Sequence, residues 1–319
     1  MNLAIIGCGV IGRRHLESIV NSSINDLNIF VIDTSNECLN ECKKIAQYKN
    51  TLKIYYLSNA KETNKNFDFV IIANNSKDRF DAIVDLYNYK KPKFIILEKF
   101  LFNNLDSYKK AKIMFDSINT KVWVNQWMGI GFSELSNTFN DVKNFKMIIN
   151  GTNWNLCSNS VHFIDWFHFI SSRKKIRLIK AKLENLVTNS KRSGFYETFG
   201  KLYFKSANNE LSLNCEYKKK SNFKIFISIS SESKNIECEF TGDKLVGSIQ
   251  YKKNKKKFKM NIKNLSERTG DIIYDILKKG ECSLPTYNQS VIHHKLIFKT
   301  LKDHFNKNGL KKYNYLPVT

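Results

Sequence analysis

Residues 1–122 combine two regular patterns of apolar and polar positions. Short apolar runs alternate with segments in which apolar residues recur every three to four positions, which predicts strands alternating with helices. This order is typical of a doubly wound parallel sheet covered by helices. The expected strands are 2–6, 28–32, 53–57, 67–73, 94–97 and 121–125, and the expected helices are 11–21, 37–48, 77–89 and 107–117.

Residues 123–319 show a different pattern, in which strand-like segments follow one another quickly and polar turns separate them. This predicts an α+β domain with a large open, mostly antiparallel sheet. We therefore expect two domains, 1–122 and 123–319. The expected strands of the second are 146–151, 176–187, 197–206, 210–217, 222–231, 234–240 and 245–251, and its helices are 158–170, 270–279 and 289–306.

One of these strands has two interpretations. In residues 223–230, apolar side chains alternate with others, so that Phe223, Ile225, Ile227 and Ile229 share one side. An apolar side fits an outer face that another subunit covers, and it equally fits an inner face that packs within the domain.

The composition bounds the class of protein. Hydrophobic residues make up 42% of the 319, enough for a packed core, and no apolar run approaches the ~18 residues that span a bilayer. The apolar segment 3–11 contains Gly7 and Gly9, and basic residues follow rather than precede it, unlike a signal peptide. We therefore expect a cytoplasmic protein without a membrane partner. The seven cysteines include no Cys-x-x-Cys pair, so we expect neither a metal site nor disulfides.

The formal net charge of +23 suggests a polyanionic partner. The lysines are, however, scattered along the chain, and their densest cluster, 252–257, falls in an expected hairpin or edge strand, where lysines also block edge pairing. A solvated basic face is therefore the preferred interpretation. An anionic small substrate is the second, and no nucleic-acid partner is expected.

A glycine-rich turn, Gly7-Cys8-Gly9-Val10-Ile11-Gly12, follows the first expected strand and opens the first expected helix. In that context it is the fingerprint of a Rossmann dinucleotide site. Gly7 permits the tight turn, Gly9 lets the backbone approach a pyrophosphate, and Gly12 lets the helix pack against the strand. The free N–H groups at the helix start, where Val10 and Ile11 lie, then bind the anion.

Asp33 ends the second expected strand, 21 residues after Gly12. A carboxylate here accepts hydrogen bonds from the adenosine ribose and repels a 2′-phosphate, so the expected cofactor is NAD rather than NADP. Thr34 and Ser35 weaken this preference, because small hydroxyl groups also line phosphate pockets.

Further motifs occur in the same order along the chain: Gly7-x-Gly9-x-x-Gly12-x-x-His15, Ala73-Asn74-Asn75-Ser76 and Glu98-Lys99. Together they resemble the Gfo/Idh/MocA oxidoreductase family. The resemblance implies a Rossmann domain that binds NAD and a second domain that binds substrate and forms a homodimer or homotetramer through its open sheet. It also implies that Asn74, Asn75, Ser76 and Glu98 belong to the cofactor site, although 74–76 equally fit a helix N-cap.

The family resembled carries Glu-Lys-Pro after its fifth strand, with the lysine where nicotinamide and substrate meet. Glu98 and Lys99 match this motif, and Phe100 replaces the proline. Lys99 is therefore the expected catalytic residue, whose ammonium stabilises charge on the substrate oxygen during hydride transfer; the alternative is an ordinary surface lysine. Phe100 implies either a non-proline cis bond or a relaxed loop.

The segment 155–165 supplies a second catalytic candidate. His162 matches a family histidine, and the resemblance implies that it takes the proton of a substrate hydroxyl. A buried structural histidine is the alternative, since its neighbours are apolar. The family's aspartate four residues earlier is Ser158 here, whose hydroxyl binds a sugar but carries no charge. Asp165 is expected to be structural.

Three further residues are candidates for binding the substrate. Trp154 and Asn155 precede the expected helix, in a position to stack on and hydrogen-bond a pyranose, although a core tryptophan is an equal alternative. Gln126 lies at the junction of the two expected domains. Arg79 stands where family members often have histidine.

These features predict an NAD(H)-dependent oxidoreductase acting on a secondary alcohol or ketone of a sugar, sugar acid or nucleotide-sugar. Synthesis of cell-surface polysaccharides is one setting for such a substrate. Phe100 and Ser158 motivate the alternative of an NAD(H)-binding sensor or partner protein without hydride chemistry.

Overall fold

The computed structural model describes residues 1–24, 26–47, 52–139, 142–219, 223–252, 254–310 and 314–319. The end of the expected helix 37–48, the start of the expected strand 222–231 and Lys253 lie outside the described residues. The chain folds into two compact units. The first consists of 1–125, 263–291 and 319, and the second of 126–262 and 292–318.

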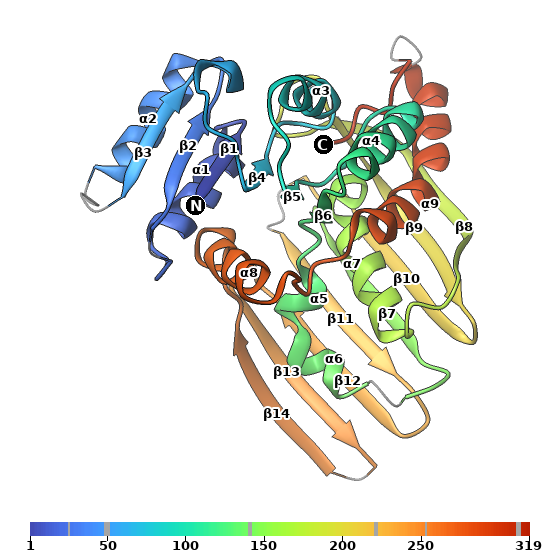
Figure 1. Ribbon diagram of the computed structural model, residues 1–319. Helices are drawn as coiled ribbons and strands as arrows, with labels where there is room; N and C mark the ends of the chain where they lie inside the picture. The colour runs from blue at the N-terminus through green and yellow to red at the C-terminus, as the bar shows by residue number, and fades with distance from the viewer. Residues whose placement is uncertain (25, 48–51, 140–141, 220–222, 253, 311–313) are drawn as a thin grey trace. The chain divides into compact units, whose positions relative to one another are not determined.

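The first unit is built on a six-stranded parallel sheet in the order β3-β2-β1-β4-β5-β6 (Figure 1). The order reverses between β1 and β4, the switch point at which such sheets bind ligands. Leu3, Ala4 and Ile5 have no exposed surface, as expected for a strand covered on both faces. The strands are β1 (Asn2–Ile6), β2 (Asn28–Ile32), β3 (Lys53–Leu57), β4 (Phe69–Ile72), β5 (Phe94–Leu97) and β6 (Lys121–Val124).

Helices connect these strands, and polar side chains mark where several of them begin. Ser35 Oγ accepts the N–H of Cys38 at 3.3 Å, and Asn104 Oδ1 accepts that of Asp106 at 2.9 Å, as N-caps do. The helices are α1 (Val10–Val20), α2 (Asn36–Ala46), the 3₁₀ turn η1 (Ala60–Glu62), α3 (Arg79–Tyr89) and α4 (Leu105–Ser117).

Helix α8 (Leu265–Lys279) belongs to the first unit, although it follows the strands of the second in sequence. It packs on α1, where the N–H of Gly270 donates to Ser18 Oγ at 3.0 Å. A Cβ on Gly270 would lie 2.6 Å from that of Ser22, so the glycine permits the close approach. The sequence predicted a single domain boundary near 122–123. The structure differs, because the contact between α1 and α8 places residues 263–291 in the first unit.

The second unit is built on an eight-stranded sheet in the order β14-β13-β12-β11-β7-β10-β9-β8. Strands β7 and β10 pair in parallel, and all other neighbours are antiparallel. The strands are β7 (Lys146–Thr152), β8 (Ile176–Asn189), β9 (Tyr196–Ser206), β10 (Asn209–Glu216), β11 (Lys224–Ser230), β12 (Lys234–Phe240), β13 (Lys244–Tyr251) and β14 (Asn254–Asn261).

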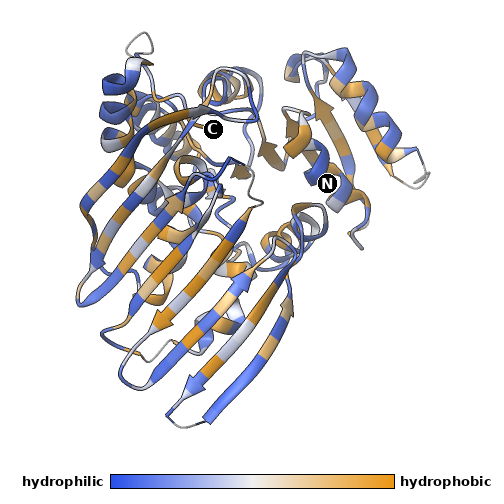
Figure 2. Cartoon of the chain, turned by 180° about the vertical axis from the view of Figure 1, so that it is seen from behind, coloured by the Kyte–Doolittle hydropathy of each residue, from blue (hydrophilic) through white to orange (hydrophobic). Residues whose placement is uncertain are grey.

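Helix α7 packs on β9 and β10 of this sheet. Hydrophobic and hydrophilic residues alternate along its strands (Figure 2). In β11, Ile225, Ile227 and Ile229 are buried, whereas Phe226 is 48% exposed, so the apolar side of this strand is an inner face. The helices are α5 (Met128–Gly131), α6 (Ser133–Asn137), α7 (Leu156–Ile170), α9 (Tyr287–Phe305), which begins in the first unit, and the turn η2 (Asn306–Leu310).

Strand β14 forms one edge of the sheet and carries the exposed lysines Lys255, Lys256 and Lys257. The structure thus confirms the prediction of an edge strand for most of the lysine cluster. The predicted fold class, a doubly wound parallel sheet plus a large, mostly antiparallel one, is also confirmed. Within the described residues, we find no helix that combines the length and apolarity needed to cross a membrane.

Candidate functional site

The glycine turn after β1 has the shape that a dinucleotide requires. Gly7 has φ +87°, and its N–H donates to the carbonyl of Ile32 at 3.0 Å. A Cβ on Gly7 would lie 2.7 Å from the backbone nitrogen of Asn74, and one on Gly12 would lie 2.0 Å from the Gly7 oxygen. Both positions therefore require glycine for packing.

Gly9 serves a different purpose from these two glycines. A Cβ built on Gly9 meets nothing within 4 Å, so the glycine keeps open space beside the backbone. Gly9 is also the N-cap of α1, without a side-chain cap, and no acidic residue lies in the first turn. Val10 is 63% exposed at this helix start. The free N–H groups and the helix dipole suit a pyrophosphate.

Asp33, at the end of β2, is held in place by the backbone around it. Its Oδ2 accepts the N–H of Cys8 at 2.5 Å, and its Oδ1 accepts that of Ser35 at 2.8 Å. The carboxylate therefore joins the glycine turn to the start of α2, and its direction is fixed before any ligand binds.

A cavity of about 300 Å³ in the first unit lies beside Gly7 and Asp33. Asn74 also lines it, and Asn74 Oδ1 is buried without a hydrogen-bond partner among the described residues. A polar atom left in this state calls for a ligand or a water as partner. The full lining is Ile6, Gly7, Ile32, Asp33, Thr34, Ser58, Asn59, Ala60, Asn74, Asp81, Ala82 and Asp85. The residues present thus fit the adenosine end of a dinucleotide.

The neighbours of Asn74 have structural partners. Asn75 Oδ1 accepts the N–H groups of Lys77 and Asp78, at 2.9 and 3.1 Å, and so holds the turn before α3, whose N-cap, Asp78, makes no side-chain cap bond. The N–H of Ser76, a buried residue, donates to Thr319 Oγ1 at 3.1 Å. The structure thus places Asn75 in the turn before the helix and not at its N-cap, and a role of Asn75 and Ser76 in cofactor binding stays a prediction.

Glu98, at the end of β5, is the centre of a buried polar network. Its carboxylate accepts hydrogen bonds from His15 Nε2 at 3.0 Å and from the amide of Asn125, and His15 Nδ1 lies 2.8 Å from Thr269 Oγ1 of α8. Burial alone would raise the pKa of Glu98. The hydrogen bond and charge of His15, with the bond from Asn125, more than offset burial and lower it. A carboxylate is therefore fixed directly before Lys99.

The Lys99–Phe100 peptide bond is cis, which selects one of the two conformations expected from the loss of proline. Lys99 is half-buried, and Phe100 is fully buried. The guanidinium of Arg79, also buried, donates to the carbonyls of Phe100 and Leu101, the latter at 2.7 Å, and to that of Asn74. Arg79 therefore ties the loop that carries Lys99 to the loop that lines the cavity.

In the second unit, Ser158 and His162 lie one turn apart on α7, and both are at least 93% buried. The His162 ring lies 6.0 Å from that of Trp127, between ring centroids. Glu197 of β9, also buried, accepts the N–H groups of Cys157 at 2.7 Å and Ser158 at 3.2 Å. A carboxylate at a helix N-terminus is favourable, so Glu197 anchors the turn that carries Ser158.

The other substrate-binding candidates of the second unit have different environments. Trp154 has no exposed surface, and its indole N–H donates to the carbonyl of Asn214 at 2.8 Å, so the structure shows the core alternative rather than a stacking platform. Gln126 is fully buried, and its amide donates to the Val161 carbonyl at 2.7 Å; its role in binding the substrate stays a prediction. Asn155 is exposed, with φ +60° at the N-cap of α7.

Asp165 belongs to a buried cluster further along α7. Its carboxylate accepts from Arg173 at 3.1 Å, and His293 Nδ1 lies 3.8 Å away. His293 in turn contacts His168 at 2.9 Å. Burial raises the pKa of Asp165 to about 7, against the charge of Arg173, and burial lowers the pKa of both histidines. The cluster holds the helix in the core, in line with the structural role expected for Asp165.

Sequence reasoning missed several of these residues. Glu197 and Thr269 act through contacts with residues far away in the sequence, so no local signal marks them. Asp81 and Asp85 line the cavity beside Asp33, and their four-residue spacing on a predicted helix was a usable signal. Over the part of the chain that the structure describes, no three His, Cys, Asp or Glu side chains are grouped so as to hold a metal ion.

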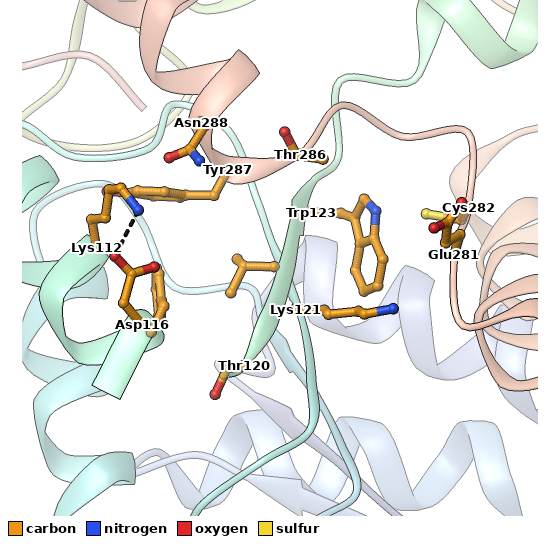
Figure 3. Close-up of a pocket in the computed structure, with 12 residues that line it drawn as sticks. Lys112, Asp116, Thr120, Lys121, Trp123, Glu281, Cys282, Thr286, Tyr287 and Asn288 are labelled. Atoms are coloured by element: carbon orange, nitrogen blue, oxygen red, sulfur yellow. Dashed lines mark hydrogen bonds and ion pairs between the residues drawn. The ribbon is translucent and has the colours of Figure 1, made fainter. Parts of the chain in front are cut away.

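Another cavity of the first unit, about 390 Å³, lies beside β6 (Figure 3). Its charged groups have partners: Lys112 pairs with Asp116 at 2.6 Å, and Lys121 donates to the carbonyl of Gly280 at 3.1 Å. Burial raises the pKa of the Cys282 thiol in its wall to about 12, so this cysteine is a poor nucleophile. None of the residues predicted from the sequence for cofactor or substrate lines this cavity.

Comparison with solved structures shows the same fold at low sequence identity. An oxidoreductase from Agrobacterium radiobacter, in complex with NAD+, L-tartaric acid and magnesium, matches with a TM-score of 0.71 and 13% identity over 93% of this chain and 94% of its own. UDP-N-acetylglucosamine 3-dehydrogenase from Acidithiobacillus ferrooxidans matches with 0.71 and 9%, over 94% and 96%. A mutant 3-ketoreductase from Actinomadura kijaniata, with TDP-benzene and NADP, matches with 0.70 and 10%, over 95% and 97%.

Sequence comparison finds a family match for the N-terminal part of the chain. No curated protein matches the chain. Residues 1–126 match the model of the GFO_IDH_MocA family, described as an oxidoreductase family with an NAD-binding Rossmann fold. This span contains the glycine turn, Asp33 and the Glu98-Lys99 pair. These motifs and the match together show that the N-terminal part of the chain is similar to the Gfo/Idh/MocA family of oxidoreductases with an NAD-binding Rossmann fold.

Proposed function

We propose that this chain is an NAD(H)-dependent oxidoreductase that acts on a secondary alcohol or ketone of a sugar, a sugar acid or a nucleotide-sugar. One observation carries the proposal: Lys99 follows the fifth strand of the same sheet whose first turn fits a dinucleotide. Ligands of such sheets bind at the carboxyl ends of the strands, where both features lie.

The residues of the first unit would hold the cofactor as follows. The N–H groups at the start of α1 bind the pyrophosphate, and the fixed carboxylate of Asp33 accepts the ribose hydroxyls. Bound NAD supplies the hydride acceptor or donor. Asp33 favours NAD over NADP, because a carboxylate repels a 2′-phosphate.

Lys99 and His162 would perform the polar part of the reaction. The Lys99 ammonium donates to the substrate oxygen and stabilises the negative charge that develops on it during hydride transfer. His162 accepts the proton of the hydroxyl during oxidation and returns it during reduction. Ser158, one turn before His162, hydrogen-bonds a sugar hydroxyl without adding charge. Two proteins of similar structure, a nucleotide-sugar 3-dehydrogenase and a 3-ketoreductase, support a sugar-type substrate.

Two features support an extension of this proposal to its substrate and its assembly. The net charge of +23 favours an anionic substrate such as a sugar acid or nucleotide-sugar, the kind used to build cell-surface polysaccharides. The eight-stranded sheet exposes Ile148, Phe226 and Val246 by 43 to 48%, which suits a homodimer or homotetramer that covers them.

Lys99→Ala tests the catalytic part. We expect kcat, followed by NADH absorbance with a panel of keto-sugars and nucleotide-sugars, to fall by roughly 10²–10³-fold, as on loss of one charge-stabilising donor. Lys91→Ala, an exposed lysine on the same segment, should leave kcat unchanged. Full turnover by Lys99→Ala would rule out the assignment.

A second function, that of a non-catalytic NAD(H) sensor or partner, is favoured by Phe100 and Ser158. It predicts that NADH binds while no sugar or keto-sugar of the panel changes its absorbance, even at high enzyme concentration.

A further inference from the structure

The cavity beside the glycine turn has an unusual charge for this chain. Three of its lining residues are aspartates, Asp33, Asp81 and Asp85, and no lysine or arginine lines it among the described residues. The whole chain carries 52 lysines and arginines against 29 aspartates and glutamates. A wall with three acids and no base is therefore a local reversal of the protein's charge.

The two aspartates of α3 are placed to act together. Asp81 and Asp85 lie one turn apart and therefore on one face of the helix, and Ala82, a small residue, also lines the cavity. The first turn of a helix favours an acid, which accounts for Asp81 but not for Asp85, because the dipole effect decreases after that turn. None of the three aspartates has an ion pair among the residues that the structure describes, so no bound cation side chain neutralises them.

Asp33 cannot turn away from the cavity to relieve repulsion without breaking contacts. Its two oxygens accept the N–H groups of Cys8 and Ser35, at 2.5 and 2.8 Å. An anionic group that enters the cavity therefore meets a fixed carboxylate from β2 and two more from α3. A ribose with free hydroxyls meets acceptors instead.

We infer that Asp81 and Asp85 are specificity residues that act with Asp33 to exclude a 2′-phosphorylated dinucleotide. The inference rests on the proposed function in one respect, that the glycine turn binds a dinucleotide. Asp81 and Asp85 are exposed to solvent, and both line the same cavity as Gly7 and Asp33, within residues matched to an NAD-binding family. Coulomb repulsion between unit charges ~7 Å apart, at an effective dielectric constant of ~40, corresponds to a factor of roughly five to ten in affinity.

The test is the ratio of the NADPH and NADH dissociation constants, measured by fluorescence titration on the full chain. We compare wild type with Asp81→Asn, Asp85→Asn and the double variant. Asp106→Asn, an exposed acid in the first turn of α4 that does not line the cavity, is the matched control. Circular dichroism of each variant establishes that it is folded.

We expect wild type to bind NADH at least tenfold more tightly than NADPH at low salt. Each single variant should lower this ratio several-fold, and the double variant more, chiefly through tighter NADPH binding. The ratio should also fall as salt rises, because a Debye length of about 10 Å at 0.1 M screens charge but not shape. Asp106→Asn should match wild type.

Four outcomes would overturn the inference. Equal binding of NADH and NADPH by wild type, or a double variant whose ratio equals that of Asp106→Asn, rejects the role of these aspartates while leaving dinucleotide binding intact. A ratio that does not change with salt assigns the discrimination to shape. If neither dinucleotide binds to any of the folded proteins, the proposed function fails together with the inference.

Discussion

The two units of the molecule position their candidate residues by different means. In the first unit, Gly7 and Asp33 each follow a strand directly and Lys99 follows one after a single residue, so the parallel sheet brings them to the same edge. In the second unit, the turn that carries Ser158 depends on Glu197, which lies 39 residues further along the chain. A nucleotide site can therefore be encoded in short local motifs, whereas the helix with His162 is held by long-range contacts.

Gly12→Ala tests whether the glycine turn of the first unit depends on local packing, and it should produce the largest effect. A Cβ at this position would lie 2.0 Å from the Gly7 oxygen, so α1 cannot keep its place. We expect the free energy of unfolding to fall by about 3 kcal/mol or more, and NADH binding to be lost, as urea titration and fluorescence titration would show. Wild-type stability in this variant would contradict the close packing described here.

Gly9→Ala tests the same turn without disturbing its packing, because a Cβ there meets nothing within 4 Å. Stability should stay within about 0.5 kcal/mol of wild type. NADH should nevertheless bind at least tenfold more weakly, since the methyl group occupies the space that the pyrophosphate needs. If NADH bound normally to Gly9→Ala, the pyrophosphate would have to lie elsewhere.

Glu197→Ala tests the second half of the comparison. It leaves two N–H groups of α7 without their acceptor in a buried place, which costs about 1–3 kcal/mol of unfolding free energy. Glu197→Gln keeps one acceptor and should cost less, and Glu216→Ala, an exposed acid on the same sheet, should cost almost nothing. The dissociation constant of NADH should be unchanged in all three. A loss of NADH binding in Glu197→Ala would contradict this expectation.

Asp165→Asn should give the smallest effect, visible as a pH dependence. The folded-state pKa of about 7 lies above the ordinary value, so the folded protein binds more protons between about pH 4 and 7, and its unfolding free energy falls as pH rises through that window. The variant lacks this loss, so its unfolding free energy relative to that of wild type should rise as pH increases from about 4 to 7. The lowered pKa values of His168 and His293 act in the opposite direction, but they are common to both proteins. A constant difference between pH 4 and 8 would contradict the raised pKa.

Much of the first unit could be predicted because its information is local. Alternating periodicities gave its strands and helices to within a few residues, and the glycine turn, Asp33 and Glu98-Lys99 are each readable as short motifs. The return of α8 could not be predicted, because Gly270 meets Ser18 only in the folded chain.

In the second unit, even less could be predicted about which side chains are buried. The alternation in β11 identified an apolar side, but only the packed structure shows that Ile225, Ile227 and Ile229 face inward. Trp154 and Gln126 have the chemistry of sugar-binding residues, and burial decides their environment. Residue type predicts what a side chain can bind, whereas its exposure depends on elements that are distant in sequence.

A crystal structure with NAD bound tests the central claim most directly. We expect the pyrophosphate on the N–H groups at the start of α1, the adenosine ribose on Asp33 and the nicotinamide C4 facing the ammonium of Lys99. A pyrophosphate bound away from Gly9, or a nicotinamide ring that Lys99 does not reach, would contradict it.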